Sequence, residues 1–182
     1  MKTNFPFEPQ KATEVAARFI LLSKGTINIM KLVKLVYLLD RESIARRGVP
    51  VVGGVYLSMR NGPVTSEILD LINAGSLWHC DTNWAQFIAA RQNHEVALGD
   101  DPGVEHLSVF ELELIAELSS QFEKADQWAI TTWCHEHCGE WLPLDKGAEP
   151  ISLAELAEEV GQPADEILGN AAEQNFLAKV FG

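Results

Sequence analysis

The densest group of reactive side chains is the run Cys-His-Glu-His-Cys at residues 134–138. Thiolates and imidazoles are the ligands that zinc prefers. Cys134 and Cys138 share one face of a helix because they are four residues apart, and His79 and Cys80 could complete a set of four ligands. A single Cys-x3-Cys pair is an incomplete zinc pattern, however, and the cysteines can equally pack as small hydrophobic side chains. We therefore expect no metal or other cofactor, and these four residues are the candidate ligands if zinc binds.

The same run could also supply a thiol nucleophile and a histidine base. Cys134 and His135 are adjacent, and adjacent side chains on a helix point about 100° apart, so they do not face each other. The glycines at 53–54 and 62 match neither the Walker nor the dinucleotide-binding pattern. We predict that the chain is not an enzyme. A metal- or thiol-dependent enzyme built on residues 134–138 is the alternative.

Residues 152–168 have the apolar spacing of a helix-turn-helix, with Gly161 at the turn. Affinity for DNA rests largely on Lys and Arg side chains that neutralise phosphates. Residues 149–178 contain seven acidic side chains and no basic one. DNA is therefore not an expected partner, and a DNA-binding regulator that uses the C-terminal helices is a second alternative.

Charge is distributed unevenly along the chain. Residues 1–60 hold ten Lys and Arg against four Asp and Glu, whereas residues 61–182 hold four against twenty-two, which together give the net charge of −12. Such polarity favours oriented association with a charged partner. A solubilising acidic surface is the other interpretation.

A basic helix at residues 29–47 is the most promising binding element. Lys31 and Lys34 are neighbours on it, and Arg41 continues the positive charge toward its C-terminal end. These cations either form a solvated face or bind an acidic patch of a partner. Tyrosines and arginines nearby are either interface residues or core residues with satisfied polar groups. The partner-binding candidates are Lys31, Lys34, Tyr37, Arg41, Tyr56 and Arg60.

The spacing of apolar residues predicts a mainly α-helical fold, a compact helical domain with one small β-hairpin after the second helix. Gly53-Gly54 is the expected hairpin turn, and residues 55–60 alternate as a half-buried strand does. Pro63 and Thr65 are expected to open the third helix. The predicted helices cover residues 10–23, 29–47, 63 to about 73, 109–123, 127–138, 153–160 and 164–180.

Two helix starts carry the capping-box pattern, Ser108-x-x-Glu111 and Ser152-x-x-Glu155. A chain of 182 residues is long enough for one core, so residues 1–182 are predicted to form a single domain. Residues 150–182 could instead be a helical C-terminal appendage to it.

Composition also indicates the compartment. No apolar run approaches the roughly 20 residues that span a bilayer, so no membrane association is expected. The first nine residues do not read as a signal peptide. Cysteines at 80, 134 and 138 cannot all pair within the chain, which favours a reducing environment. We expect a cytoplasmic protein.

Several of these segments, in this order, resemble the Panacea domain of SocA-like antitoxins, which is also found in phage-associated proteins. The resemblance covers roughly residues 10–160. One departure is that Trp133-Cys134 stands where the family prefers Leu and Ser or Thr before the histidine. The resembling segments are Lys-Leu-Val-Lys-Leu-Val-Tyr at 31–37, Gly48-Val49-Pro50, Gly62-Pro63-Val64, the helix at 107–122, and residues 133–141 with His135 and Trp141.

The resemblance implies an antitoxin that neutralises a cognate toxin by direct protein–protein contact, with a role in phage defence. It also implies that some members deliver a toxin to an ATP-dependent protease. Pro63, in the resembling turn, joins the partner-binding candidates. A second copy of the chain, in a homo-oligomer, is a further candidate partner.

Overall fold

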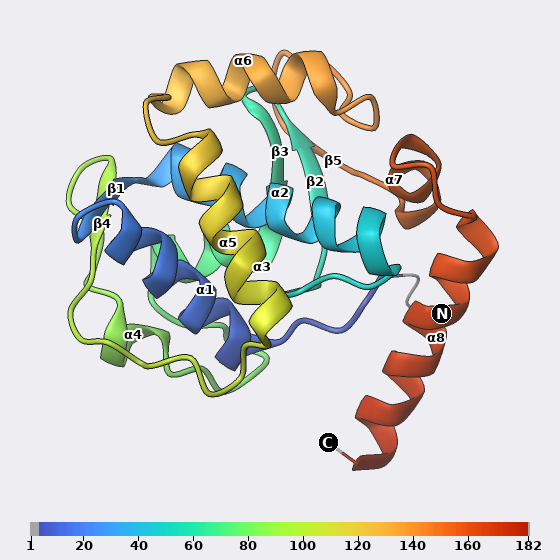
Figure 1. Cartoon of the computed structure of the whole chain (residues 1–182), viewed down its shortest axis with the longest axis horizontal. Coiled ribbons are helices and arrows are strands. Elements are labelled where there is room, and N and C mark those ends of the chain that lie inside the picture. The colour runs from blue at the N-terminus through green and yellow to red at the C-terminus, as the bar shows by residue number, and fades with distance from the viewer. Residues whose placement is uncertain (1–3, 182) are drawn as a thin grey trace.

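Helix α2 (Ile29–Arg47) is the central element of the protein. In the computed structural model, which describes residues 4–181, α2 is contacted by α1, α3, α5, α6 and α7 (Figure 1). The helix begins where the side chain of Asn28 accepts a hydrogen bond of 2.9 Å from the amide of Met30. It ends at Gly48, whose φ of 74° is the left-handed conformation that glycine tolerates. Both ends agree with the predicted range of 29–47.

The fold is mainly α-helical, as predicted. Both capping boxes form: Ser108 and Ser152 accept hydrogen bonds from the amides of Glu111 and Glu155, and each glutamate side chain accepts one from the amide of its capping serine. None of the helices in residues 4–181 combines the length and apolar character needed to cross a membrane. The other helices are α1 (Pro9–Leu22), α3 (Ser66–Ala74), α4 (Trp84–Phe87), α5 (Val109–Gln121), α6 (Gln127–His137), α7 (Leu153–Glu159) and α8 (Ala164–Phe181).

The β-hairpin follows α2 but is displaced from its predicted position. Strands β2 (Tyr56–Met59) and β3 (Gly62–Thr65) pair antiparallel, so the turn lies at residues 60–61. The predicted turn at residues 53–54 is wrong, because the amides of residues 51–53 all donate to the buried carboxylate of Asp40. Pro63 lies in β3, and α3 begins only at residue 66.

Three short strands were not predicted. Strand β5 (Ala148–Pro150) pairs with β2, which makes a three-stranded sheet in the order β3-β2-β5. Strands β1 (Thr26–Asn28) and β4 (Glu95–Ala97) form a separate two-stranded sheet. Each is only three residues long and gives little periodicity in the sequence.

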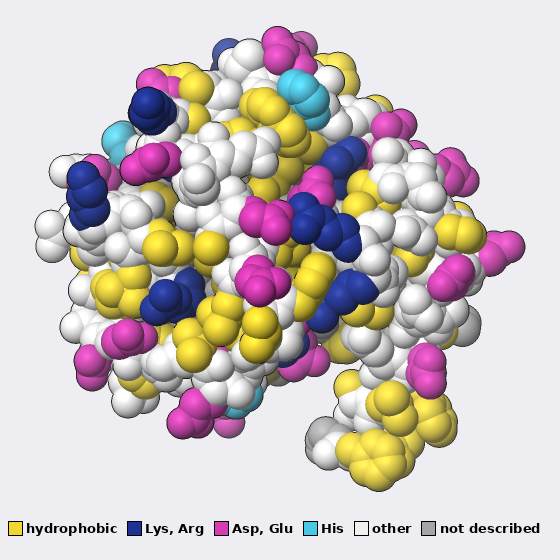
Figure 2. Space-filling view, viewed as in Figure 1, with side chains coloured by type: hydrophobic (Ala, Val, Ile, Leu, Met, Phe, Trp, Pro, Cys, Tyr) yellow, Lys and Arg dark blue, Asp and Glu magenta, His cyan; other side chains and the backbone are white. Residues whose placement is uncertain are grey.

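Helix α8 extends from the rest of the protein to the C-terminal end of the described chain (Figure 1). Its first half is attached to the end of α2: Gln162, just before α8, donates to the carbonyl of Ala45 at 2.7 Å, and Asn170 donates to that of Gly48 at 3.2 Å. Figure 2 shows hydrophobic side chains gathered at its far end. The exposed ones are Phe176, Leu177, Val180 and Phe181.

Candidate partner-binding groove

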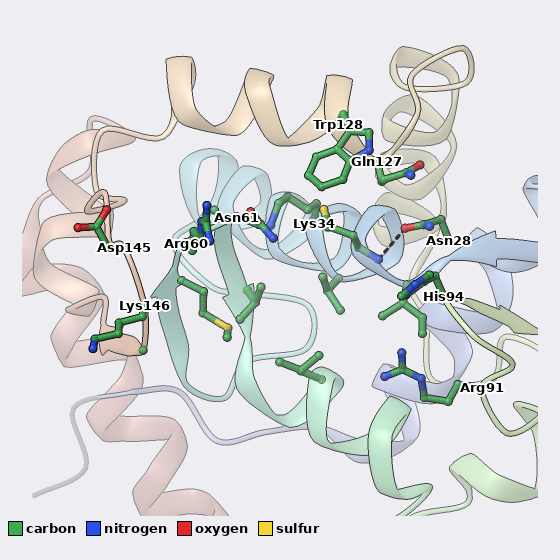
Figure 3. Close-up of a pocket in the computed structure, with 18 residues that line it drawn as sticks. Asn28, Lys34, Arg60, Asn61, Arg91, His94, Gln127, Trp128, Asp145 and Lys146 are labelled. Carbon is green, nitrogen blue, oxygen red and sulfur yellow. Dashed lines mark hydrogen bonds between the residues drawn. The ribbon is translucent and has the colours of Figure 1, made fainter.

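A groove of about 650 Å³, here called the hairpin groove, lies where the β2–β3 hairpin meets the N-terminal ends of α2 and α6. Figure 3 shows α6 above it and the hairpin behind it. Apolar side chains from four elements line the groove, and Trp128 of α6 reaches it with 55% of its surface exposed. The apolar lining residues are Ile29, Met30, Val33, Met59, Val64 and Leu69. A preformed apolar hollow beside an exposed tryptophan is typical of a binding surface.

Positive charge surrounds this apolar lining. Arg91 and Lys146 lie on opposite sides of the groove, and Arg60 lies on the hairpin turn (Figure 3). Lys34 is the fourth cation and Asp145 is the only acidic residue among the lining residues. Residues 61–182 contain just four Lys and Arg, and two of them line the groove. The groove is therefore a cationic site on a chain with a net charge of −12.

Lys34 is buried beneath the hairpin, with 1% of its surface exposed. Its Nζ donates a hydrogen bond of 3.2 Å to the carbonyl oxygen of Pro63. Gly62 makes this approach possible, because a Cβ atom there would lie 2.9 Å from Cε of Lys34. Its φ of 101° is also a conformation that other residues rarely adopt. Burial lowers the pKa of Lys34 to about 8, so the side chain is still mainly protonated at neutral pH.

The segment after α6 is hydrogen-bonded to strand β2 of the hairpin. Trp141 donates from Nε1 to the carbonyl of Met59 at 2.8 Å, and the amide of Leu142 donates to Ser58 Oγ at 3.0 Å. The ring of His135 stacks on Trp141, with centroids 3.9 Å apart. Burial and the nearby Lys34 lower the pKa of His135, which favours the neutral ring. The resembling turn at 62–64 and the His135–Trp141 pair thus meet at one hairpin.

A buried polar cluster joins α2 to the end of α6. Arg41 donates from Nε to Glu140 Oε1 at 2.8 Å, and the hydroxyl of Tyr37 donates to the same oxygen. Glu140 has no exposed side-chain surface. Tyr37 and Arg41 are therefore bonded within the fold, and a contact of either residue with a partner stays a prediction.

Three more predicted contact residues are also used within the fold. Tyr56 is buried and its hydroxyl donates to Asp40 Oδ2 at 2.9 Å. Lys31 donates to the carbonyls of residues 122 and 125, both at 2.8 Å, and so closes the C-terminal end of α5. Pro63 is buried in β3. Of the seven candidates, only Lys34 and Arg60 line the groove.

Sequence reasoning missed the groove residues Arg91, His94, Trp128 and Lys146. Arg91, His94 and Lys146 belong to connecting segments, which are brought to the groove by the pairing of β4 with β1 and of β5 with β2.

The candidate zinc ligands do not converge. Cys134 and Cys138 are buried, His79 is exposed, and among residues 4–181 no three His, Cys, Asp or Glu side chains are grouped to hold a metal ion. A hydrogen bond from Cys138 lowers the pKa of Cys134, against the opposite effect of burial. The ring of His135 packs on Trp141.

A family model described as antitoxin SocA-like, Panacea domain, matches residues 32–142. The matched range runs from the first turn of α2 to the residue after Trp141, and so contains the hairpin and the polar clusters that fix it. No curated protein and no solved structure matches the chain.

Proposed function

On the premise that this chain belongs to the Panacea-domain family of SocA-like antitoxins, we propose that it neutralises a toxin protein by direct contact through the hairpin groove. The antitoxin covers a surface that the toxin needs for its activity. This mechanism requires no covalent chemistry from the antitoxin, and it operates in the cytoplasm, where free thiols are stable.

The observation that carries the proposal is the combination of apolar lining, exposed Trp128 and four cations in one preformed groove. Tryptophan and arginine are the residues most often found to dominate binding energy at interfaces. A stable interface buries about 800 Å² on each partner, which exceeds the groove itself. The groove is therefore the centre of the contact, and the adjoining surfaces of the hairpin and α6 form its rim.

Electrostatics favours the same surface. Cations at the rim attract an acidic toxin surface and raise the rate of encounter, while the remaining acidic surface disfavours other orientations. The helix α2 and the hairpin are held by buried hydrogen bonds, so little conformational entropy is lost when the groove binds.

The test uses the protein encoded next to this gene, which the proposal predicts to be toxic when expressed alone. Co-expression of the antitoxin should restore growth. Trp128→Ala should weaken binding by about 30-fold or more, because it removes a large side chain from the centre of the contact. Trp78→Ala is the matched control, since Trp78 is 97% exposed and lies outside the groove.

Two results would count against the proposal in different ways. Binding without growth rescue rejects neutralisation, and unchanged binding by Trp128→Ala rejects the groove as the site. Delivery of the bound toxin to an ATP-dependent protease and a role in phage defence are further predictions. The first is tested by the half-life of the toxin in cells with and without the antitoxin.

A further inference from the structure

Lys34 is a buried cation that lacks a counter-charge within the described chain. No ion pair in residues 4–181 includes it, and its one hydrogen bond is to the neutral carbonyl of Pro63. An ammonium group has three donors, so two of them have no acceptor among residues 4–181. The other titratable side chains nearby are the thiols of Cys134 and Cys138, which oppose the charge only when one of them ionises, and the ring of His135. The half-buried Arg41 contrasts with it, because Arg41 is paired with Glu140.

A buried charge without a partner is costly, because desolvation isn't offset by an opposite charge. A methionine in the same place would fill a similar volume without that cost. The fold gives the ammonium no structural task that a neutral side chain could not replace, apart from a single hydrogen bond. Lys34 forms part of the wall of the groove beneath the hairpin, so an anion that enters there and displaces the covering hairpin can supply the missing charge.

The neighbouring residues specify what kind of ligand fits. Arg60 adds a second cation on the hairpin turn, and the apolar side chains of Val33 and Met59 line the same groove. Trp128 stands at the α6 side of the same hollow (Figure 3). An anion that reaches Lys34 must therefore arrive beside an apolar group.

We propose that the hairpin groove binds an acidic segment of the toxin, in which an Asp or Glu side chain pairs with Lys34 and a neighbouring apolar side chain packs against Trp128. This inference rests on the proposed function and names the chemistry of the toxin surface. Burial of the ion pair gives specificity, because a partner without the carboxylate leaves Lys34 unpaired.

The first test is the variant Lys34→Met, measured against the toxin described above. Free Lys34→Met should be at least as stable as the wild type, whereas its affinity for the toxin should fall about 10- to 100-fold, the usual range for loss of a charged hydrogen bond. Lys179→Met, on exposed α8, is the matched control and should bind as the wild type does. A purely structural role for Lys34 predicts the reverse, lower stability with unchanged affinity.

Unchanged toxin affinity in Lys34→Met overturns the inference, while binding and rescue by the wild type still support the proposed function. Failure of the wild type to bind the toxin rejects the proposed function itself.

The second test does not depend on the toxin or on the folding of the variant. The probes are the peptides acetyl-Phe-Glu-amide and acetyl-Phe-Gln-amide, titrated into the wild-type protein and followed by NMR. The Glu peptide should shift the signals of Lys34, Arg60 and Trp128, and the Gln peptide should not. Equal effects of the two peptides, no effect of either, or tighter binding of inorganic phosphate than of the Glu peptide would each overturn the inference.

Discussion

Trp141 donates a hydrogen bond of 2.8 Å from its indole Nε1 to the carbonyl oxygen of Met59, and this bond ties the segment after α6 to the last residue of β2. Met59 lines the hairpin groove directly. The shape of the groove therefore depends on a side chain that is 82 residues away in the sequence.

Replacement of this donor should loosen the hairpin. Trp141→Phe keeps an aromatic ring to stack on His135 but leaves the carbonyl of Met59 without its partner. We expect the free energy of unfolding to fall by about 1–2 kcal/mol, measured by urea denaturation. Amide hydrogen exchange in β2 and β3 should become faster. An unchanged exchange rate there would contradict the role given to Trp141.

The pair of buried Glu140 and half-buried Arg41 should matter far more than an exposed one. Glu140→Gln leaves the guanidinium of Arg41 without its counter-charge, and we expect a loss of about 3 kcal/mol in unfolding free energy. Arg46→Gln is the control, because Arg46 pairs with Glu117 at an exposed site, where such pairs contribute below about 1 kcal/mol. Similar losses in the two variants would refute the distinction.

Glu111 should make stability depend on pH in the acid range. Burial raises the pKa of Glu111, but Lys11, the amide of Ser108 and Arg47 outweigh it and lower the pKa to about 2. A carboxyl with a depressed pKa stabilises the fold above its unfolded pKa of 4.5. That contribution, about 3 kcal/mol, is lost as the pH falls from 4.5 toward 2.

Thermal unfolding across this range checks the prediction. Glu111→Gln should remove most of the loss on acidification, and Glu155→Gln, in the exposed capping box, should leave it intact. A wild-type curve that is flat from pH 4.5 to 2.5 would be inconsistent with the paired carboxylate.

The charge of Arg60 should act on the rate of association. Arg60 is exposed, and no hydrogen bond or ion pair among residues 4–181 engages its side chain. Arg60→Glu should reduce the association rate of the toxin about tenfold at low salt, with less difference at high salt, because exposed charges are screened. Stopped-flow mixing at several salt concentrations measures this. A difference that is confined to the dissociation rate would argue against steering.

Lys34 should lower the stability of the free protein near neutral pH and less so in alkali. Its pKa is lowered from 10.5 to about 8 by burial, while Cys134 and Cys138 act in the opposite direction; the ring of His135 lies near it and is neutral in this range. The folded protein thus loses its proton first. The free energy of unfolding of the wild type should therefore rise by about 3 kcal/mol relative to that of Lys34→Met as the pH increases from 8 to 10.5. The measurement is urea denaturation of both proteins at several pH values. A difference in unfolding free energy that does not change with pH would disprove the prediction.

Local sequence patterns predicted most helices well. The caps at Asn28 and Ser108 are local interactions, in which a side chain accepts a hydrogen bond from an amide two or three residues away. They therefore form independently of the tertiary packing. The displaced hairpin shows the limit of such patterns. Gly53-Gly54 fits a turn locally, but the amide of Gly53 instead donates a hydrogen bond to the carboxylate of Asp40, thirteen residues earlier.

Side-chain type alone also could not separate binding residues from structural ones. Lys31 and Lys34 lie on the same helix with the same chemistry, yet one closes the end of α5 and the other lies at a groove. The difference is set by which elements pack on each face of α2, and that packing joins residues more than a hundred positions apart.

The sequence by itself determined a mainly helical chain, the position of its central helix, and the order of segments typical of the family, because these depend on short-range spacing. Only the tertiary structure decided where a partner can bind. The groove brings together Lys34, Arg60, Arg91, Trp128 and Lys146 from separate elements, and long-range packing, which no local pattern encodes, places them around one hollow.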